Sequence, residues 1–210
     1  MTHVSLVRDR RRFAVQLTLL FALCAFASAA AQAQATRIRG QITGVKGDML
    51  SVKTREGKDI QIKLSEQTAV AASKALKLED LKPGDYIGTT TEKRADGGLV
   101  AVEVHILPKT AKPGHTPWDL KPGAMMTNGN IAPGASVVKS AGGQQLKIDY
   151  EGGSQTVIVP PGTPIVTSVP ADRSYLKPGE YIFTTATAGP DGVLTTQRVQ
   201  VSHDGVRPPQ

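Results

Sequence analysis

The sequence has a single cysteine, few aromatic residues and no long apolar run after residue 31. Its one cysteine, Cys24, lies inside the N-terminal apolar run, so residues 36–210 contain none. Disulfides, thiolate metal sites and cysteine nucleophiles are therefore excluded from that region. Without a further apolar run of bilayer-spanning length, we expect no membrane span there. A fold of this composition depends on packing alone.

The N-terminus has the three-part pattern of a secretory signal peptide. Arginines at 8, 10, 11 and 12 precede the uncharged apolar run Phe13–Ala31, and A-x-A cleavage sites follow at 27–29, 31–33 and 33–35. We predict that residues 1–35 are cleaved and that the mature protein is periplasmic or secreted. An uncleaved anchor is the alternative reading. Residues 10–13 also fit the R-R-x-F core of a twin-arginine signal, so the export route stays open between Sec and twin-arginine.

The basic charge of the chain is concentrated at this N-terminus. The whole sequence has 25 Lys+Arg and 18 Asp+Glu; residues 1–35 hold four arginines and Asp9, which leaves 21 against 17, a net charge of +4. The remaining lysines are scattered, and after the signal the aromatics are few. Neither feature is typical of a nucleic-acid-binding surface, so we expect no nucleic-acid partner.

A repeat with an offset of 95 residues organises the rest of the chain. Residues 81–106 align without a gap to residues 176–201, and 12 of the 26 positions are identical. Within each copy, apolar residues alternate with polar ones and Gly-containing turns separate the runs, which predicts short antiparallel strands. Only residues 75–81 have a short helical pattern. The fold class we predict is all-β, with two tandem small OB-like β-barrels joined by a Pro-rich linker.

The predicted domains follow the repeat. They are a signal peptide at 1–35, one OB-like β module at 36–107, a Pro-rich linker at 108–129, a second OB-like β module at 130–202 and a loose polar tail at 203–210. Each module has about 70 residues, which is a thin core without cross-links. We therefore expect the two modules to pack on each other.

Several motifs resemble a bacterial family of exported OB-like domains that is classed as a domain of unknown function. They are L-K-P-G-[DE]-x-I at 81–87 and 176–182, I-x-G-x-I at 38–42, E-V-H-I-L at 103–107, P-W-D-L at 117–120, M-T-N at 126–128 and V-P-P-G-T-P-I-V at 159–166. The resemblance implies a fold and an export address but no established activity. Members often carry the label "metal ABC transporter permease", which does not suit a chain without several apolar spans.

The candidate site residues lie between the two copies of the repeat. We predict a ligand site there with Trp118 and His115. The same region holds His105, Met125 and Met126, and imidazole with thioether ligands suits Cu(I) or Ag(I). A soft-metal site with His105, His115, Met125 and Met126 is therefore an alternative, and simple packing of Trp118 and the methionines between the modules is another.

No catalytic constellation is visible in the sequence. There is no G-x-S-x-G motif, and the carboxylates of the repeat lie at turns, where they cap backbone amides. We therefore expect a non-enzymatic protein without a cofactor, whose partner is a small ligand or an envelope protein. The alternative function is a periplasmic chaperone or sensor for a copper or silver ion.

Overall fold

The computed structural model describes residues 35–133, 138–140 and 143–209, and this part of the chain is all-β. The predicted signal peptide lies outside the described residues, apart from Ala35. The elements in chain order are β1 (Ala35–Lys46), β2 (Met49–Thr54), β3 (Asp59–Ala75), the 3-10 helix η1 (Leu78–Asp80), β4 (Tyr86–Lys93), β5 (Leu99–Ile106), β6 (Gly114–Pro117), β7 (Met125–Ile131), β8 (Val138–Ser140), β9 (Gly143–Tyr150), β10 (Gly153–Val159), β11 (Ile165–Ala171), the 3-10 helix η2 (Arg173–Tyr175), β12 (Tyr181–Ala188) and β13 (Leu194–Val201).

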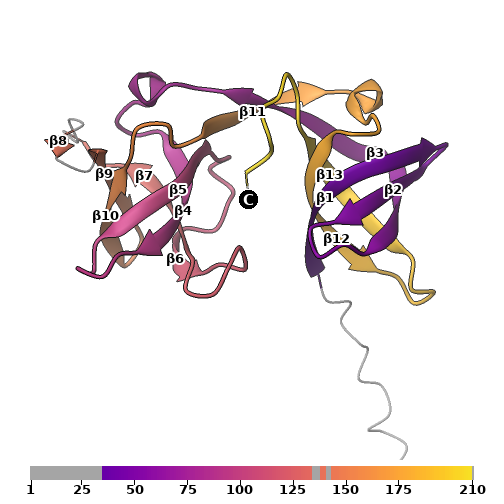
Figure 1. The fold of residues 1–210 in the computed structure, drawn as a ribbon, viewed down its shortest axis with the longest axis horizontal. Coiled ribbons are helices and arrows are strands. Elements are labelled where there is room, and N and C mark those ends of the chain that lie inside the picture. The colour runs from indigo at the N-terminus through magenta and orange to yellow at the C-terminus, as the bar shows by residue number, and fades with distance from the viewer. Residues whose placement is uncertain (1–34, 134–137, 141–142, 210) are drawn as a thin grey trace, which may run out of the picture. The chain divides into compact units, whose positions relative to one another are not determined.

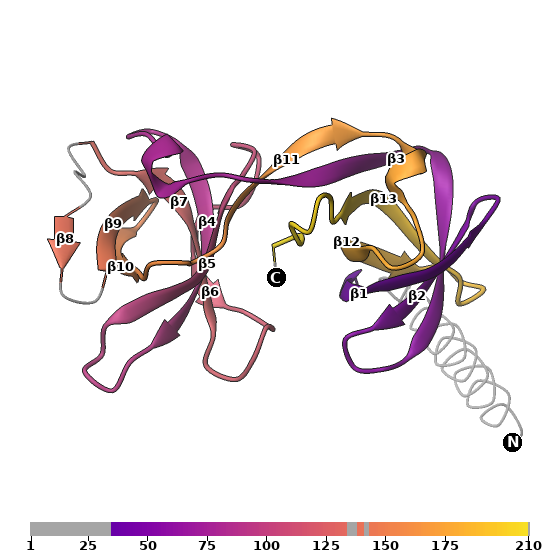
Figure 2. The ribbon, with the colours of Figure 1, turned by 45° about the horizontal axis from the view of Figure 1, so that its top comes forward.

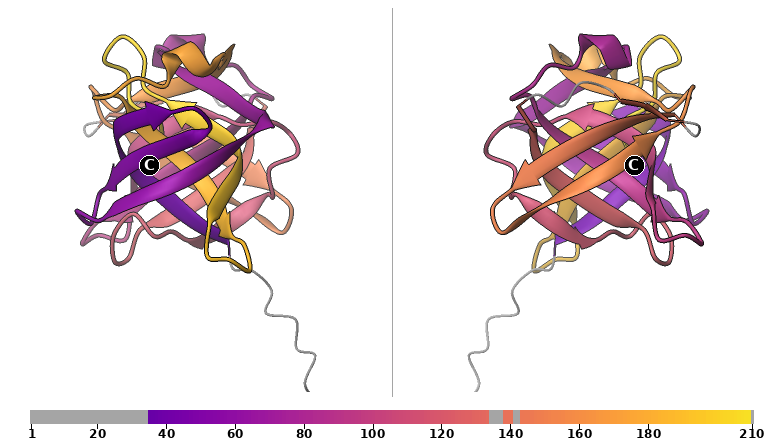
Figure 3. Two further views of the ribbon diagram at one scale, coloured as in Figure 1. Left: turned by 90° about the vertical axis from the view of Figure 1, so that its right-hand side faces the viewer. Right: turned by 90° about the vertical axis from the view of Figure 1, so that its left-hand side faces the viewer.

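Strand pairing closes two rings, and each ring is a β-barrel. The first barrel is the ring β1–β2–β3–β13–β12, which the β12–β1 pair closes. The second barrel is the ring β4–β5–β10–β9–β7, which the β7–β4 pair closes. The short strands β6 and β8 pair with β7 and β9. In the left view of Figure 3, the indigo strands β1 to β3 lie beside the yellow-orange strands β12 and β13.

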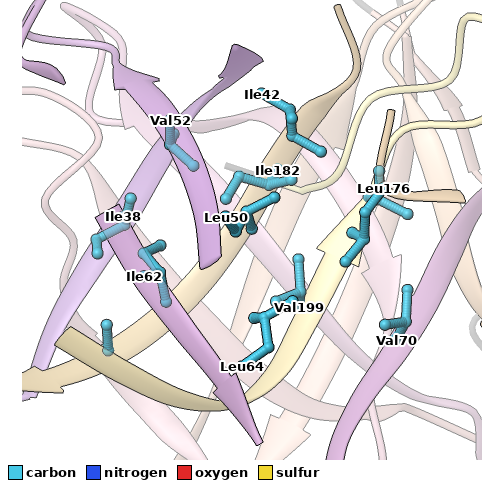
Figure 4. Close-up of a cluster of buried hydrophobic side chains, with 12 residues drawn as sticks. Ile38, Ile42, Leu50, Val52, Ile62, Leu64, Val70, Leu176, Ile182 and Val199 are labelled. Atoms are coloured by element: carbon cyan, nitrogen blue, oxygen red, sulfur yellow. The ribbon is translucent and has the colours of Figure 1, made fainter. Parts of the chain in front are cut away.

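Each barrel encloses its own cluster of buried aliphatic side chains, because apolar residues alternate along its strands. The cluster of the first barrel, shown in Figure 4, consists of Ile38, Ile42, Leu50, Val52, Ile62, Leu64, Val70, Leu176, Ile182, Ala186, Val199 and Val201. The cluster of the second barrel consists of Ile87, Ala101, Val104, Ile131, Leu146, Ile148, Val157, Val159 and Ile165. Burial stabilises the fold by about 1.5–3 kcal/mol for each large aliphatic side chain.

The strand β11 joins the two barrels. It pairs in parallel with β5 of the second barrel and antiparallel with the end of β3 from the first (Figures 1 and 2). In the β3–β11 pair, Ser73 lies opposite Ser168, and these two residues are 95 positions apart. Equivalent segments of the repeat thus pair with each other in antiparallel fashion. A pseudo-two-fold axis that relates the two copies therefore passes through this strand pair.

The two barrels do not follow the predicted modules 36–107 and 130–202. Strands β1 to β3 of the first module pair with β12 and β13 of the second, while β4 and β5 pair with β7, β9 and β10. The copies therefore exchange halves. The physical reason is that a duplicated sequence offers equivalent strands, which satisfy the same pairing within one copy or between the two copies.

Three local expectations also need correction. The predicted linker 108–129 contains β6 and most of β7, and β7 is a full barrel strand. The helical pattern at 75–81 forms only the single turn η1, because Ala75 still pairs with β11. In the tail predicted to be loose, 203–210, Pro208 and Pro209 are buried.

Candidate ligand site between the barrels

A cavity of about 270 Å³ lies between the outer face of the second barrel and that of the first. Strands β5, β7, β11, β12 and β13 contribute to its lining, together with the segment after Ile106 and the segment near the end of the described residues. The lining residues that carry the argument are His105, Trp118, Met126, Asn128, Phe183, Gln200 and Pro209. A concave space with aromatic walls and a few polar groups is the usual form of a small-ligand site.

Strand register explains why His105 and Asn128 reach the same space. Gly88 of β4 lies opposite His105 of β5 on one side and opposite Asn128 of β7 on the other. A Cβ atom at Gly88 would lie 2.5 Å from His105 Nε2 and 2.9 Å from a methyl carbon of Leu107. The missing side chain therefore leaves room for the imidazole to lie across β4, and only glycine fits without a shift.

His105 is a buried imidazole with an unused nitrogen. The residue is 7% exposed, and its Nδ1 atom has no hydrogen-bond partner within the described part of the chain. Burial lowers the pKa of His105 to about 4, so the ring is neutral at pH 7. The nearest carboxylate, Glu103 Oε1, is 4.0 Å from Nδ1 and accepts a hydrogen bond of 3.0 Å from Thr90 Oγ1. A buried polar atom without a partner is costly unless a ligand supplies one.

Two amide side chains line the same space. Asn128 donates through Nδ2 to the Lys112 carbonyl oxygen at 3.0 Å, and its Oδ1 atom is buried without a partner among the described residues. Gln200 is 8% exposed and donates to Ser73 Oγ at 3.5 Å, a long and weak contact. Two residues of the cavity lining, His105 and Asn128, thus each have a buried polar atom without a partner among the described residues.

Cationic side chains of β1 hold Trp118 in place. The Arg37 guanidinium lies 4.1 Å from the centroid of the Trp118 ring, and the Arg39 guanidinium lies 5.6 Å from it and 5.1 Å from the Phe183 ring. Arg39, which is 5% exposed, also donates to Asp119 Oδ1 at 2.8 Å. Burial alone would raise the pKa of Asp119, but this hydrogen bond and the charges of both arginines hold it below its usual value. The segment at 118–119 is thus bound to the first barrel.

The segment after β13 closes another side of the cavity. Asp204 and Gly205 both have positive φ, and the backbones of His203 and Val206 exchange hydrogen bonds across them. This two-residue turn reverses the chain, as Asp-Gly turns do in hairpins. Arg207 then lies over the Tyr181 ring, 3.8 Å from its centroid, and Pro209 reaches the cavity lining.

A larger but more open groove of about 940 Å³ adjoins the cavity and shares Phe183, Arg198 and Gln200 with it. Its other walls are largely threonines of β12 and β13. The hydroxyls of Thr184 and Thr196 donate to backbone carbonyls, so they stabilise the strands. The groove is wider, but the residues with unpartnered buried polar atoms, His105 and Asn128, line the cavity. We therefore place the candidate site in the cavity.

The predicted site residues separate into two groups. His105, Trp118 and Met126 line the cavity, whereas His115 and Met125 are absent from its lining. His115 Nδ1 instead forms a 2.8 Å hydrogen bond with Thr127 Oγ1. Among the described residues, no group of three or more His, Cys, Asp or Glu side chains could hold a metal ion.

Sequence reasoning missed the lining residues Asn128, Phe183, Gln200 and Pro209. A signal for two of them was present in the repeat. Gln200 is the equivalent of His105 at the offset of 95, and Phe183 is the equivalent of Gly88. Comparing the exposed faces of equivalent strands would have pointed to these positions.

Comparisons with protein-family models, curated proteins and solved structures gave no match. The resemblance to the family of exported OB-like domains therefore stays a prediction. Within the described residues, no helix has the length and apolar character needed to cross a membrane.

Proposed function

We propose that this protein is an exported, non-enzymatic binding module of the cell envelope, and that its ligand enters the cavity between the two OB-like barrels. The observation that supports this most strongly is that two residues of the cavity lining, His105 and Asn128, each have a buried polar atom, Nδ1 and Oδ1, without a hydrogen-bond partner among the described residues. A ligand that hydrogen-bonds to these atoms, with a small shift of the two side chains toward the cavity, would offset their desolvation cost.

The neutral imidazole of His105 and the amide of Asn128 favour an uncharged ligand group. His105 is neutral at pH 7 because burial lowers its pKa to about 4. A neutral imidazole nitrogen donates or accepts according to its tautomer, whereas the Asn128 oxygen only accepts. A primary amide can donate a hydrogen bond to the Asn128 oxygen and can either donate to or accept from the imidazole nitrogen. An apolar group attached to the amide would pack against Trp118 and Phe183.

Benzamide is a suitable probe, because it combines a primary amide with an aromatic ring. Trp118 is the only tryptophan, so its fluorescence reports on the cavity directly. We expect a saturable change on titration with benzamide, and at least tenfold weaker binding in the His105→Leu variant, which keeps the volume but loses the nitrogens.

His115→Ala is the matched control, because His115 belongs to the predicted site but not to the cavity lining. Its affinity for benzamide should equal that of the unmodified protein. Equal binding by His105→Leu, or the absence of saturable binding to folded protein, would refute the proposed site.

A second candidate function is soft-metal binding, because His105 and Met126 line one cavity beside Trp118. Imidazole and thioether are ligands that suit Cu(I) and Ag(I). If this function holds, Ag(I) should quench Trp118 fluorescence stoichiometrically, and Met126→Leu should abolish the effect. Met125→Leu and His115→Ala should leave it unchanged. An unaltered response of Met126→Leu would eliminate this candidate.

A further inference from the structure

We propose that the junction at the cavity is a binding site for a peptide segment with a basic residue followed by two prolines, and that Arg207–Pro209 of the chain itself is bound there and forms one wall of the cavity. This inference rests on the proposed function, since it names the ligand class of the same cavity. It starts from the observation that Pro209 lines the space together with Trp118 and Phe183.

The segment is directed to the cavity by its own sequence. After β13, the Asp204-Gly205 turn reverses the chain, and the His203–Val206 bridge fixes the reversal. The two prolines that follow cannot continue a sheet ladder, because proline has no amide hydrogen. Consecutive prolines favour the extended polyproline II conformation, which docks into grooves with aromatic walls at a low entropic cost.

The contacts of the segment match this mode of recognition. Pro208 and Pro209 are both buried, which is unusual for the residues that follow a last strand. The Arg207 guanidinium lies 3.8 Å from the centroid of the Tyr181 ring, a cation–π contact. The basic side chain thus lies on the Tyr181 ring, while Pro209 reaches the cavity between the barrels.

The repeat supplies an independent argument. At the offset of 95, Arg207-Pro208 corresponds to Lys112-Pro113, and Tyr181 corresponds to Tyr86. In that first copy, the Tyr86 hydroxyl donates to the Ala111 carbonyl at 2.8 Å. A basic residue followed by proline thus comes shortly after the last strand of both copies, and a tyrosine at the start of the preceding strand contacts this region in each.

Occupancy by Arg207–Pro209 is separable from the fold. The clusters of buried side chains contain no residue after Val201, and no strand follows β13 in the described part of the chain. Removing Arg207–Gln210 therefore takes no side chain from either core. The barrels should remain folded and expose the cavity wall that Pro209 covers.

The test uses the chain without Arg207–Gln210 and a synthetic peptide with the sequence of residues 204–210. Trp118 fluorescence reports binding. We expect saturable binding of the peptide to the shortened chain and at least tenfold weaker binding to the full chain, whose own segment competes. A peptide with both prolines replaced by alanine should bind at least tenfold more weakly, and one with alanine for arginine about threefold more weakly.

Equal binding of the peptide to the two chains, or undiminished binding of the alanine peptide, would overturn the proposal. If the shortened chain does not fold, the full chain with Pro208→Ser and Pro209→Ser takes its place, with the same expectations. Benzamide titration of the same protein separates the two hypotheses. If benzamide binds while the peptide does not, the peptide inference fails and the proposed function stands; if neither binds, both fail.

Discussion

Two equivalent strand pairs meet at the cavity, and their exposed faces have diverged. In the β4–β5 pair, Gly88 lies opposite His105; in the β12–β13 pair, the equivalent Phe183 lies opposite Gln200. The backbone register is the same in both, since the offset of 95 relates each partner. One face presents a glycine and an imidazole, whereas the other presents an aromatic ring and an amide.

The outward-facing residues two positions earlier in β5 and β13 differ in charge. Glu103 is buried and accepts a hydrogen bond from Thr90, whereas its equivalent Arg198 is exposed. The core positions between them, Val104 and Val199, are alike and fully buried. Over residues 103–105 and 198–200, the outward-facing positions have thus diverged while the inward-facing valine is kept. This teaches that the duplicated barrels share a scaffold but form one asymmetric site between them, not two equal sites.

The largest expected effect comes from making the β4–β5 face, with Gly88 and His105, resemble the β12–β13 face, with Phe183 and Gln200. Gly88→Phe should lower the free energy of unfolding by about 3 kcal/mol, because even its Cβ atom would lie 2.5 Å from His105 Nε2. Urea unfolding measures the loss. Adding His105→Gln, the residue of the second face, should restore at least about 1 kcal/mol of that loss through coupling of the two positions.

Gly44→Phe is the control for adding a phenyl group to a strand glycine. A Cβ atom at Gly44 would meet only Ser51 side-chain atoms, at 3.9 and 4.0 Å. This variant should lose less than about 1 kcal/mol. Comparable losses at Gly88 and Gly44 would mean that the fit between Gly88 and His105 does not matter.

The next effect is a pH dependence of the free energy of unfolding, to which His105 of the β4–β5 face contributes and Gln200 of the β12–β13 face does not. Burial lowers the pKa of His105 from its usual 6.5 to about 4, so between these values the unfolded chain binds a proton that the folded chain does not. The free energy of unfolding should therefore fall by about 3 kcal/mol as the pH drops from 6.5 to 4. Gln200 cannot titrate and adds no such dependence.

His105→Gln introduces the residue found at the equivalent position 200. It should remove the contribution of His105 to the pH dependence of the free energy of unfolding. The informative quantity is the difference between variant and unmodified protein, measured by urea unfolding at several pH values, because His115 and the carboxylates titrate in both. Burial also lowers the pKa of His115, with the same sign of effect. Parallel pH profiles would contradict the burial of a neutral His105.

Local sequence signals account for much of the fold. The K-P-G motifs predict turns with a positive φ at glycine, and Gly84 and Gly179 have φ values of 86° and 95°. Alternation along residues 60–64 predicts a half-buried strand, and Ile62 and Leu64 lie in the core. These signals are predictable because each depends on neighbouring residues alone.

The exchange of halves and most of the site could not be predicted in this way. Equivalent strands of a repeat carry nearly the same pattern, so the pattern does not say which copy a strand joins. The cavity in turn forms only where the exchanged halves meet. Trp118 was predicted there because it is unrepeated, whereas Gln200 looked like an ordinary strand residue.

The smallest expected effect compares two threonines that are equivalent in the repeat. Thr90 is fully buried, and its hydroxyl donates to Glu103 Oε1 at 3.0 Å, whereas Thr185 is exposed. Thr90→Val should cost about 1–2 kcal/mol in urea unfolding, since a buried carboxylate loses a hydrogen bond. Thr185→Val should stay within about 0.5 kcal/mol. Equal losses would show that the buried carboxylate does not depend on Thr90, and the asymmetry of the two faces would then rest on Gly88 and His105 alone.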